Sequence, residues 1–477
     1  MDEQEIRGLF AKCYDVQLRD VFFLDNPVLL VYCPAMINGE ILNTLIFERL
    51  DVFFRQNQEL TADIVQKELH VPDLQSINNK DQATADVFSG KLLLVFKREK
   101  WVFSTDISHV PQRNPEETKT EVSIKGPRDD FIEDIAINVA LIRKRLRTDT
   151  LCYEQVEIGR RTRTKVGILY MDDIASKEIL QQIQDKLHAI DIDGIYSGNQ
   201  LHELITENPY PFFPKYQYTG RPDFAVQSLL SGRFLLLVDG VSYVMIIPTN
   251  LFLLLKTGED TEYTFAYNSF ERIMRIAGLA AATFLPGFWV ALTAFHQNQL
   301  PFTLLATVVE ARRGVPLPSG LEAVLMLILF ELFREAGMRL PLAIGQTLSV
   351  VGGLIIGDAA IRAGLTSPAM LVIIGASTVA TFTLANQSLV GTITLLRFFV
   401  LSFAAALGFF GYFLSVYFIF LYVANIRTFG VPYLELATRL NTMNILKAIF
   451  RLPAQKFFSR PRTLDPRDPT RMRRRKS

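Results

Sequence analysis

The sequence predicts a soluble N-terminal α/β (or α+β) domain of two subdomains, followed by an all-α domain that spans a membrane several times. Residues 1–272 carry charged side chains throughout, as soluble proteins do, whereas residues 274–424 are dominated by apolar side chains. Within the first half, residues 111–122 are polar, contain two prolines and lack apolar periodicity, which is typical of a linker. We therefore expect subdomains over residues 1–110 and 123–272.

Strands are predicted where short runs of branched and aromatic residues flank turn residues. The first subdomain has two such pairs, VFFL with VLLVYC around Asp25-Asn26-Pro27, and KLLLVF with WVFSTDI. The second has TLCYEQVEIG with TKVGILYM around the basic turn Arg160–Arg163, and FLLLVDGVSYVMII, in which Asp239-Gly240 predicts a tight hairpin. Helices are expected over residues 126–147, with Pro127 in the first turn, and over residues 176–189.

The membrane domain is predicted over residues 273–426. A membrane crossing takes about 20 predominantly apolar residues, and four stretches qualify: residues 276–296, 342–361, 369–391 and 398–426. Pro286 predicts a kink in the first stretch, and the last is longer than one crossing needs, so we expect it to tilt or project. Residues 300–338 place charges on one helical face, which predicts an amphipathic segment that is re-entrant or interfacial.

Orientation follows from the charges near the two ends of the chain. The N-terminal residues lack the pattern of an export signal, so we expect the soluble domain on the cytoplasmic side. The tail, residues 427–477, ends in RPRTLDPRDPTRMRRRKS, with eight basic and two acidic residues, which also predicts the cytoplasmic side. If both ends of the chain lie on the cytoplasmic side, the number of membrane crossings is even. The tail is expected to be disordered and either in contact with anionic membrane lipid or merely solvated.

No enzyme signature occurs in the sequence. Phosphate loops, nucleophile elbows, zinc-binding histidine pairs and CxxC clusters are absent, so we expect no catalytic residue, cofactor, metal or nucleic-acid partner. The three cysteines lack metal-ligand spacing and predict reduced, buried thiols: Cys13, Cys33 and Cys152. The arginines of the turn at residues 160–163 are interpreted as a solvated turn or an anion-binding site.

Small residues recur every four positions in the second predicted span, at Gly345, Ser349, Gly353 and Gly357. Such a stripe lets helices approach closely in lipid, where close packing drives association. It predicts a helix-packing seam, either within one subunit, around a pore or between subunits. Asp358 and Arg362 lie four residues apart near the end of this span, as a local ion pair or as part of a charged ring at a channel mouth.

Four segments together resemble the A subunit of the GerA-type spore germination receptors of endospore-forming bacteria. They are KGPRDDFIEDIAINVALIRKRLR, RPDFAVQSLLSGRFLLLVDG, FELFREAGMRLPLAIGQTLSVVGGLIIGDAAIRAG and FGVPYLEL, between about residues 125 and 436. The resemblance implies a protein of the spore inner membrane whose soluble domain faces the spore core. It also implies a permease-like B subunit and a lipoprotein C subunit as partners, and a homo-oligomeric ring that forms a nutrient-gated cation channel.

Spacing adds site residues to this picture. Val351 and Ile355 flank the small-residue stripe and are predicted, with Asp358, to line a pore or gate. Charged residues of the family-like FELFREAGMRLP segment are expected to couple the amphipathic helix to that gate, or to form structural ion pairs: Glu331, Arg334, Glu335 and Arg339. The alternatives in function are an accessory membrane protein of the stage V sporulation AF type, a secondary transporter, and a membrane-anchored enzyme.

Overall fold

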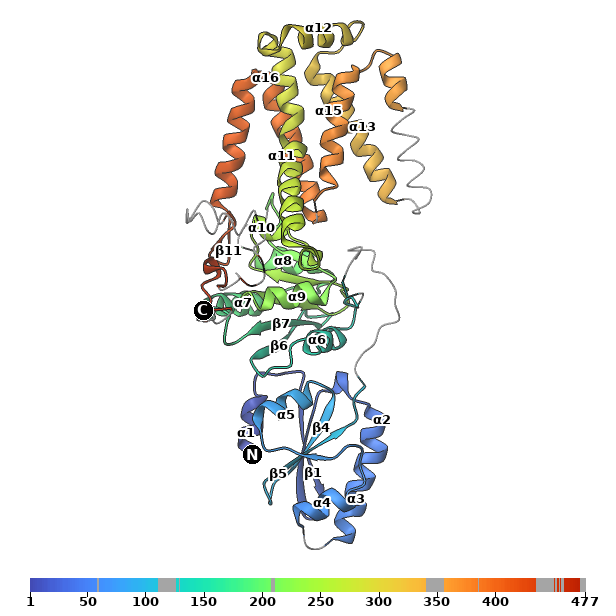
Figure 1. The fold of residues 1–477 in the computed structure, drawn as a ribbon, viewed down its shortest axis with the longest axis vertical. Coiled ribbons are helices and arrows are strands. Elements are labelled where there is room, and N and C mark those ends of the chain that lie inside the picture. The colour runs from blue at the N-terminus through green and yellow to red at the C-terminus, as the bar shows by residue number, and fades with distance from the viewer. Residues whose placement is uncertain are drawn as a thin grey trace.

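The computed structural model describes residues 1–57, 60–109, 126–127, 129–206, 211–339, 356–384, 386–434, 450, 453, 455 and 459–471. Two units built around β-sheets are followed by a region of long helices, and the three parts are arranged in a row (Figure 1). The predicted linker, residues 111–122, lies outside the described residues.

The first subdomain is a five-stranded antiparallel sheet in the order β1-β2-β4-β5-β3. Its helices cover both faces: α3 and α4 with the preceding turns on one, α1 and α5 on the other. In chain order its main elements are α1 (Glu3–Leu9), β1 (Gln17–Phe23), β2 (Asn26–Tyr32), α2 (Gly39–Ile41), α3 (Phe47–Gln56), α4 (Ala62–Glu68), β3 (Gln75–Ser76), α5 (Lys80–Val87), β4 (Lys91–Phe96) and β5 (Trp101–Asp106).

The second subdomain repeats this design. Its antiparallel sheet has the order β6-β7-β9-β10-β8, which is the same order once the strands are numbered from its own first strand. Helices α7 and α8 cover one face, and α6 and α9 cover the other. The elements are α6 (Ile135–Arg143), β6 (Leu151–Ile158), β7 (Thr164–Met171), α7 (Lys177–His188), α8 (Gly198–Ile205), β8 (Gln217–Thr219), α9 (Pro222–Leu229), β9 (Phe234–Val238) and β10 (Val244–Ile247).

The predicted strand pairs and the helix over 176–189 are present, with three local differences. The helix expected over 126–147 begins at Ile135, because the Asp134 side chain accepts hydrogen bonds from the first-turn N–H groups. Asn26 and Pro27 belong to β2, so the first turn consists of Leu24 and Asp25. The Asp239-Gly240 hairpin is not a two-residue turn: Met245 pairs with Leu236, which leaves five residues between β9 and β10.

A buried ion pair joins the two subdomains. Arg143 of α6 is completely buried and donates to both carboxylate oxygens of Asp15, at 2.8 and 2.9 Å. Its guanidinium also lies 4.0 Å from the ring centre of Phe88. Nearby, the chain before β1 pairs with the free edge of β6, because the Tyr14 N–H donates to the Tyr153 carbonyl at 3.1 Å. The contact therefore combines charge, stacking and backbone pairing.

The helical region begins after the short elements α10 (Leu251–Leu254) and η3 (Gly258–Thr261). Helix α11 leads away from the second subdomain, α12 lies across the far end, and α13 returns beside α15 (Figure 1). By length and composition, two described helices could cross a membrane, α11 and α16. The helices are α11 (Phe265–Phe295), α12 (Phe302–Ala311), α13 (Ser319–Arg339), α15 (Pro368–Thr381) and α16 (Gln387–Asn425).

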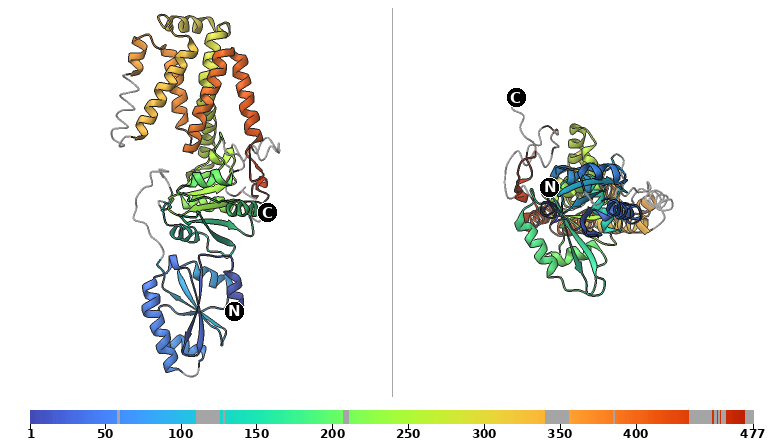
Figure 2. Two further views of the ribbon diagram at one scale, coloured as in Figure 1. Left: turned by 180° about the vertical axis from the view of Figure 1, so that it is seen from behind. Right: turned by 90° about the horizontal axis from the view of Figure 1, so that it is seen from below.

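Helix α16 consists of two arms joined at Gly408, whose φ of 59° lies in the left-handed region. Gly408 packs at the far end of α11, where an added Cβ would lie 2.9 Å from the Phe295 Cβ. In contrast, Asn386 and Tyr422, near the two ends of α16, bond to the second subdomain. The chain must therefore fold back at Gly408, and the two arms lie side by side in Figures 1 and 2.

These helices correct two predicted spans. Residues 369–391 do not form one helix, because α15 ends at Thr381 and the Asn386 side chain caps the next helix at the Ser388 N–H. Residues 398–426 are not one crossing that tilts or projects, because Gly408 divides them. The segment 300–338 contains α12 and α13, and its position relative to a membrane stays a prediction.

The expectation of a disordered tail is wrong for residues 459–471, which form a segment we call the strap. Leu464 is fully buried in the core of the second subdomain. The Arg467 N–H donates to the Ile174 carbonyl, and Arg460 Nε donates to the Leu230 carbonyl, both at 2.9 Å. The buried Leu464 side chain and these hydrogen bonds to backbone carbonyls hold the strap on the second subdomain.

Candidate functional site

The candidate site is the junction between the second subdomain and the helical region, together with the buried polar groups among the helices. Three contacts make up the junction: an ionic cluster at the start of α11, a loop under α16, and the strap. The ionic cluster holds the start of α11, the loop contacts both arms of α16, and the strap anchors the tail on the second subdomain.

The ionic cluster is centred on Asp260 in η3. Its buried carboxylate binds Arg272 Nη2 at 3.0 Å and Arg275 Nη1 at 2.9 Å, and it accepts a hydrogen bond from the Thr257 hydroxyl at 2.8 Å. Burial opposes ionisation of this carboxyl, but the two arginines outweigh it and hold the pKa of Asp260 below its ordinary value. The Asn268 side chain also donates to the Asp260 carbonyl at 2.9 Å, so the first turns of α11 are fixed to η3.

The loop before β8, residues 211–214 (Pro-Phe-Phe-Pro), contacts both arms of α16. The Thr392 hydroxyl in the first arm donates to the Phe212 carbonyl at 2.7 Å. The Phe213 ring lies between Tyr422 of the second arm and Tyr433 beyond it, at centroid distances of 6.1 and 5.9 Å. Because Phe213 is buried and proline stiffens both sides of it, movement of this loop would be transmitted to both ends of α16.

The strap forms the third contact. After α16 the chain makes the short hairpin β11 (Arg427–Thr428) and β12 (Val431–Pro432), and Phe429 between them is buried in the core of the second subdomain. Leu464 of the strap enters the same core. Both segments that follow the helical region are therefore anchored on the second subdomain.

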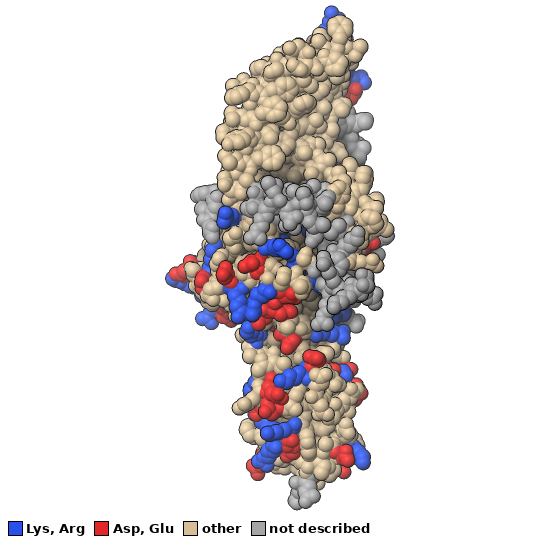
Figure 3. All heavy atoms as spheres, turned by 60° about the vertical axis from the view of Figure 1, so that its left-hand side comes forward, with Lys and Arg blue, Asp and Glu red and all other residues tan. Residues whose placement is uncertain are grey.

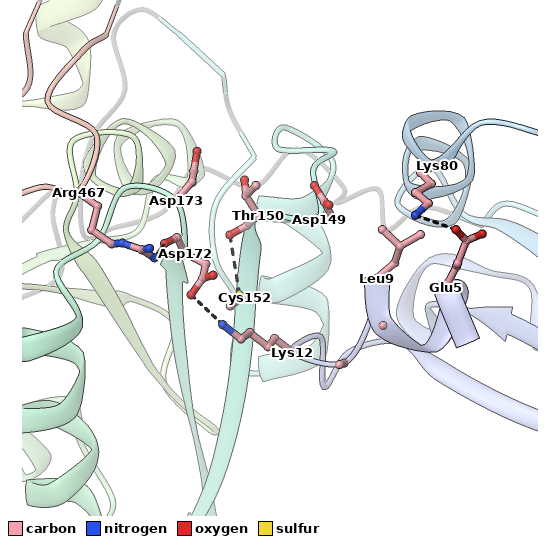
Figure 4. A pocket seen from close by; sticks show the side chains of 12 residues that line it. Glu5, Leu9, Lys12, Lys80, Asp149, Thr150, Cys152, Asp172, Asp173 and Arg467 are labelled. Carbon is pink, nitrogen blue, oxygen red and sulfur yellow. Dashed lines mark hydrogen bonds and ion pairs between the residues drawn. The ribbon is translucent and has the colours of Figure 1, made fainter. Parts of the chain in front are cut away.

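A polar cleft lies where α1, the second sheet and the strap meet (Figure 4). Lys12 binds Asp172 at 2.9 Å, and Lys80 binds Glu5 at 3.1 Å. The hydrogen bond that Lys12 donates to Asp172 raises the pKa of Lys12 above its ordinary value. Arg467 of the strap also lines the cleft. The Lys12–Asp172 pair therefore joins the chain after α1 to the second subdomain, and Arg467 of the strap donates to the Asp172 carbonyl at 2.9 Å.

The predicted coupling residues form local ion pairs on α13. Glu331 pairs with Arg334, and Glu335 pairs with Arg339 at 2.6 Å. The second pair is exposed, so it contributes little to stability. Arg334 alone reaches another helix, donating to the Thr394 hydroxyl on α16 at 3.1 Å. The four residues therefore form ion pairs within α13, and the Arg334–Thr394 hydrogen bond connects α13 to α16.

Most of the predicted seam and gate lies outside the described residues, namely Gly345, Ser349, Gly353, Val351 and Ile355. Gly357 is described and packs against α15, where an added Cβ would lie 3.2 Å from the Leu371 Cδ2. Asp358 forms the local ion pair with Arg362, at 2.8 Å, and both side chains are exposed. The structure therefore places one seam residue within a packing contact of a single chain.

Several buried charged residues were missed by the sequence reasoning, among them Arg397 and Glu322 of the helical region. Arg397, just before the predicted span 398–426, is 2% exposed and donates to backbone carbonyls of α11 and α15. Glu322 is fully buried near the far end, where its Oε1 accepts from the Ser367 N–H and hydroxyl, both at 2.7 Å. The signal was available in each case, because a single charge in an otherwise apolar run marks a functional or structural role.

The three cysteines are free and buried, as expected. Burial raises the pKa of Cys33 and of Cys152 to about 12, so neither is a reactive thiolate. Among the described residues, no group of three or more histidine, cysteine, aspartate or glutamate side chains could hold a metal ion. In the basic turn, Arg160 pairs with Asp191 in an exposed position.

Comparison with known proteins identifies the family. Residues 4–463 match the family described as Bacillus/Clostridium GerA spore germination protein. The chain is 42% identical to spore germination protein XA of Bacillus anthracis, over 99% of this chain and 97% of that protein. It is 30% identical to spore germination protein KA of Bacillus subtilis, over 92% of this chain and 81% of that protein. The chain therefore belongs to the GerA spore germination protein family.

The chain is also similar to a solved structure, the crystal structure of the N-terminal domain of the A subunit of the Bacillus megaterium spore germinant receptor GerK3. It is 25% identical, with a TM-score of 0.40, and it covers 51% of this chain and 92% of that chain.

Proposed function

We propose that this protein is the A subunit of a nutrient-responsive spore germination receptor and has no enzymatic activity. In this proposal its helical region crosses the spore inner membrane, with both ends of the chain on the core side. Its partners are further copies of itself, a permease-like B subunit, a lipoprotein C subunit and membrane lipid. Several copies together form a gated cation channel whose opening triggers germination.

The observation that carries this proposal is the attachment of the helical region to the second subdomain at each end. Asp260 holds the start of α11, and Phe213 packs against the last turns of α16. A soluble domain fixed at these points can transmit a change of shape to the helices between them. This is the arrangement that a receptor needs in order to control a membrane path.

The surface of the helical region supports a membrane location. On the face shown in Figure 3, charged side chains are spread over the two subdomains, and few lie over the helices. Large apolar side chains of the second arm of α16 are exposed, among them Phe410 (70%), Phe413 (64%) and Phe420 (58%). Exposed apolar surface of this extent is stable against lipid rather than water.

The gate is proposed on Val351 and Ile355, with Asp358 at the mouth of the path. A ring of identical subunits would bring the same apolar side chains together, and an apolar constriction closes a path by excluding water. The described helices of one chain pack closely against one another, as at Gly287, where an added Cβ would lie 2.7 Å from Val400 Cγ1. A path between subunits is therefore favoured over a path through one subunit.

The test combines mass with ion flux. The mass of the detergent-purified protein is measured by light scattering, and potassium efflux is measured from vesicles that hold wild type, Ile355→Ala or the control Val379→Ala. Val379 is an apolar side chain that is 63% exposed on α15. A symmetric oligomer in which only Ile355→Ala leaks is the expected result. A monomer with no leak in any variant contradicts the channel, and stoichiometric substrate uptake by that monomer identifies a transporter.

A further inference from the structure

Pro286 lies inside α11, and residues 265–295 remain helical around it. Proline has no backbone N–H, so it cannot donate to the carbonyl of the residue four positions earlier. That carbonyl belongs to Ala282, and both Ala282 and Pro286 are buried. A buried carbonyl that loses its helical partner costs free energy unless another donor replaces it.

Arg397 on the first arm of α16 supplies that donor. Its Nε donates to the Ala282 carbonyl oxygen at 2.7 Å, and it thereby replaces the backbone N–H that proline lacks. Its Nη2 donates to the Ser377 carbonyl on α15 at 3.3 Å. One guanidinium therefore links α11, α15 and α16 at a single level of the helical region.

Close packing and the neighbouring helix α13 surround the guanidinium. One position after Pro286, Gly287 lets the backbone of α11 approach Val400, one turn beyond Arg397 on α16. Arg334 of α13 bonds to Thr394, one turn before Arg397. Glu331, the ion-pair partner of Arg334, attracts the Arg397 guanidinium, whereas Arg334 repels it. The fourth helix, α13, is thus connected to the same level.

We propose that Arg397 is the positioning residue of the helical region, because it satisfies the carbonyl that Pro286 leaves unpaired and so fixes α11, α15 and α16 together. One consequence rests on the proposed function: in the channel, this link between three helices stabilises the closed arrangement. An arginine suits the position because its planar group offers donors in two directions at once, which a lysine does not.

A double-mutant cycle tests the link between Pro286 and Arg397. Thermal unfolding of the full chain in detergent is compared for wild type, Pro286→Ala, Arg397→Met and the double variant. Arg397→Met should lower the midpoint by about 5 °C. In the double variant, the restored N–H at position 286 donates to the Ala282 carbonyl, so at least half of the loss in the unfolding midpoint should be recovered. Additive effects would overturn the proposal.

Two further variants keep the test decisive. If Arg397→Met does not fold, the cycle is repeated with Arg397→Lys, where Pro286→Ala should again recover at least half of the loss. The control is Arg362→Met, an exposed arginine of the same region, whose effect Pro286→Ala should leave unchanged. Equal rescue of both arginine variants would show a general stabilisation by Pro286→Ala and would overturn the pairing.

Ion flux separates this inference from the proposed function. Vesicles with Arg397→Lys should lose potassium several times faster than wild type, and addition of Pro286→Ala should slow the loss again. Rescue of unfolding with no flux in any variant, Ile355→Ala included, contradicts the channel but retains the positioning role. Additive unfolding effects remove the positioning role whatever the flux.

Discussion

The two soluble subdomains have the same architecture but different contacts. Each places five antiparallel strands in the same order, with one pair of helices on each face. In the second, the edge strand β6 is paired with the chain before β1, and the loop before β8 contacts α16. In the first, β1 is an edge strand, and Phe22 and Leu24 at its end are 70% and 62% exposed.

The comparison shows where the second subdomain has been adapted. Its sheet and helices follow the design of the first, and the differences lie in the segments that connect or follow the strands. The loop at residues 211–214, the turn η3 and the strap are all of this kind. Loops on a rigid scaffold commonly carry function, because they can change without loss of the core. Four substitutions test whether the contacts of the second subdomain depend on these particular residues.

The largest effect is expected where the two subdomains meet. Arg143→Met leaves the buried carboxylate of Asp15 without its partner, so the free energy of unfolding should fall by about 3–5 kcal/mol. Urea unfolding of the full chain in detergent measures this loss. The control is Arg160→Met, because its pair with Asp191 is exposed and should contribute no more than about 1 kcal/mol. Equal losses in the two variants would show that the buried pair does not join the subdomains.

The loop at residues 211–214 offers a matched pair of neighbours. Phe213→Ala removes a buried ring between Tyr422 and Tyr433, which should cost about 3–4 kcal/mol. Phe212→Ala removes a ring that is 60% exposed and should cost about 1 kcal/mol or less. Thermal unfolding of both variants measures the difference. A loop that is not part of the junction would give the same small loss for both.

The strap is tested at its one fully buried side chain. Leu464→Ala should destabilise the second subdomain by about 2–4 kcal/mol and expose the strap to limited proteolysis. The matched change in the first subdomain is Leu24→Ala, at a leucine that is 62% exposed, and should cost less than about 0.5 kcal/mol. Protease resistance of the Leu464→Ala strap, equal to wild type, would contradict its docking.

The smallest effect depends on pH. Burial, and then the nearby Lys215, lower the pKa of His202 to about 3, whereas a histidine in an unfolded chain has a pKa of about 6.5. Below pH 6.5 the unfolded chain therefore binds a proton that the folded chain does not. Stability from this group is complete above about pH 6.5 and falls by about 1.4 kcal/mol per pH unit toward pH 3.

Substitution of His202 isolates its contribution to the pH dependence of the free energy of unfolding. In His202→Gln the fall in stability between about pH 6.5 and pH 4.5 should be smaller than in wild type by about 2–3 kcal/mol. Unfolding midpoints in urea at several pH values provide the measurement. Parallel profiles for His202→Gln and wild type would contradict a buried, neutral histidine.

The sequence predicted the strand pairs and apolar helices because these depend on local patterns. Runs such as KLLLVF identify a strand without knowledge of its neighbours. The repeat of strand order was not predictable, because it depends on pairings between distant segments such as β7 and β9. The family could be predicted from motifs in the chain, and the family match confirms that interpretation.

The errors in the second half of the chain have different causes. Residues 398–426 are apolar throughout, so the fold at Gly408 gave no signal in hydropathy. The strap has a basic composition typical of disorder, yet one leucine in a complementary core position is enough to dock it. Arg397 was passed over because it stands just outside an apolar run, and its partner carbonyl at Ala282 is 115 residues away.

The fold at Gly408 brings both ends of α16 to the second subdomain. Its most direct test is the distance between nitroxide labels on Phe382→Cys and Arg427→Cys, two exposed positions that flank α16, in the full chain in detergent. A straight helix of 39 residues would separate the ends by about 58 Å. A distance of less than about half of that value is expected, because the two arms of α16 fold back at Gly408. A separation near the full length would contradict it.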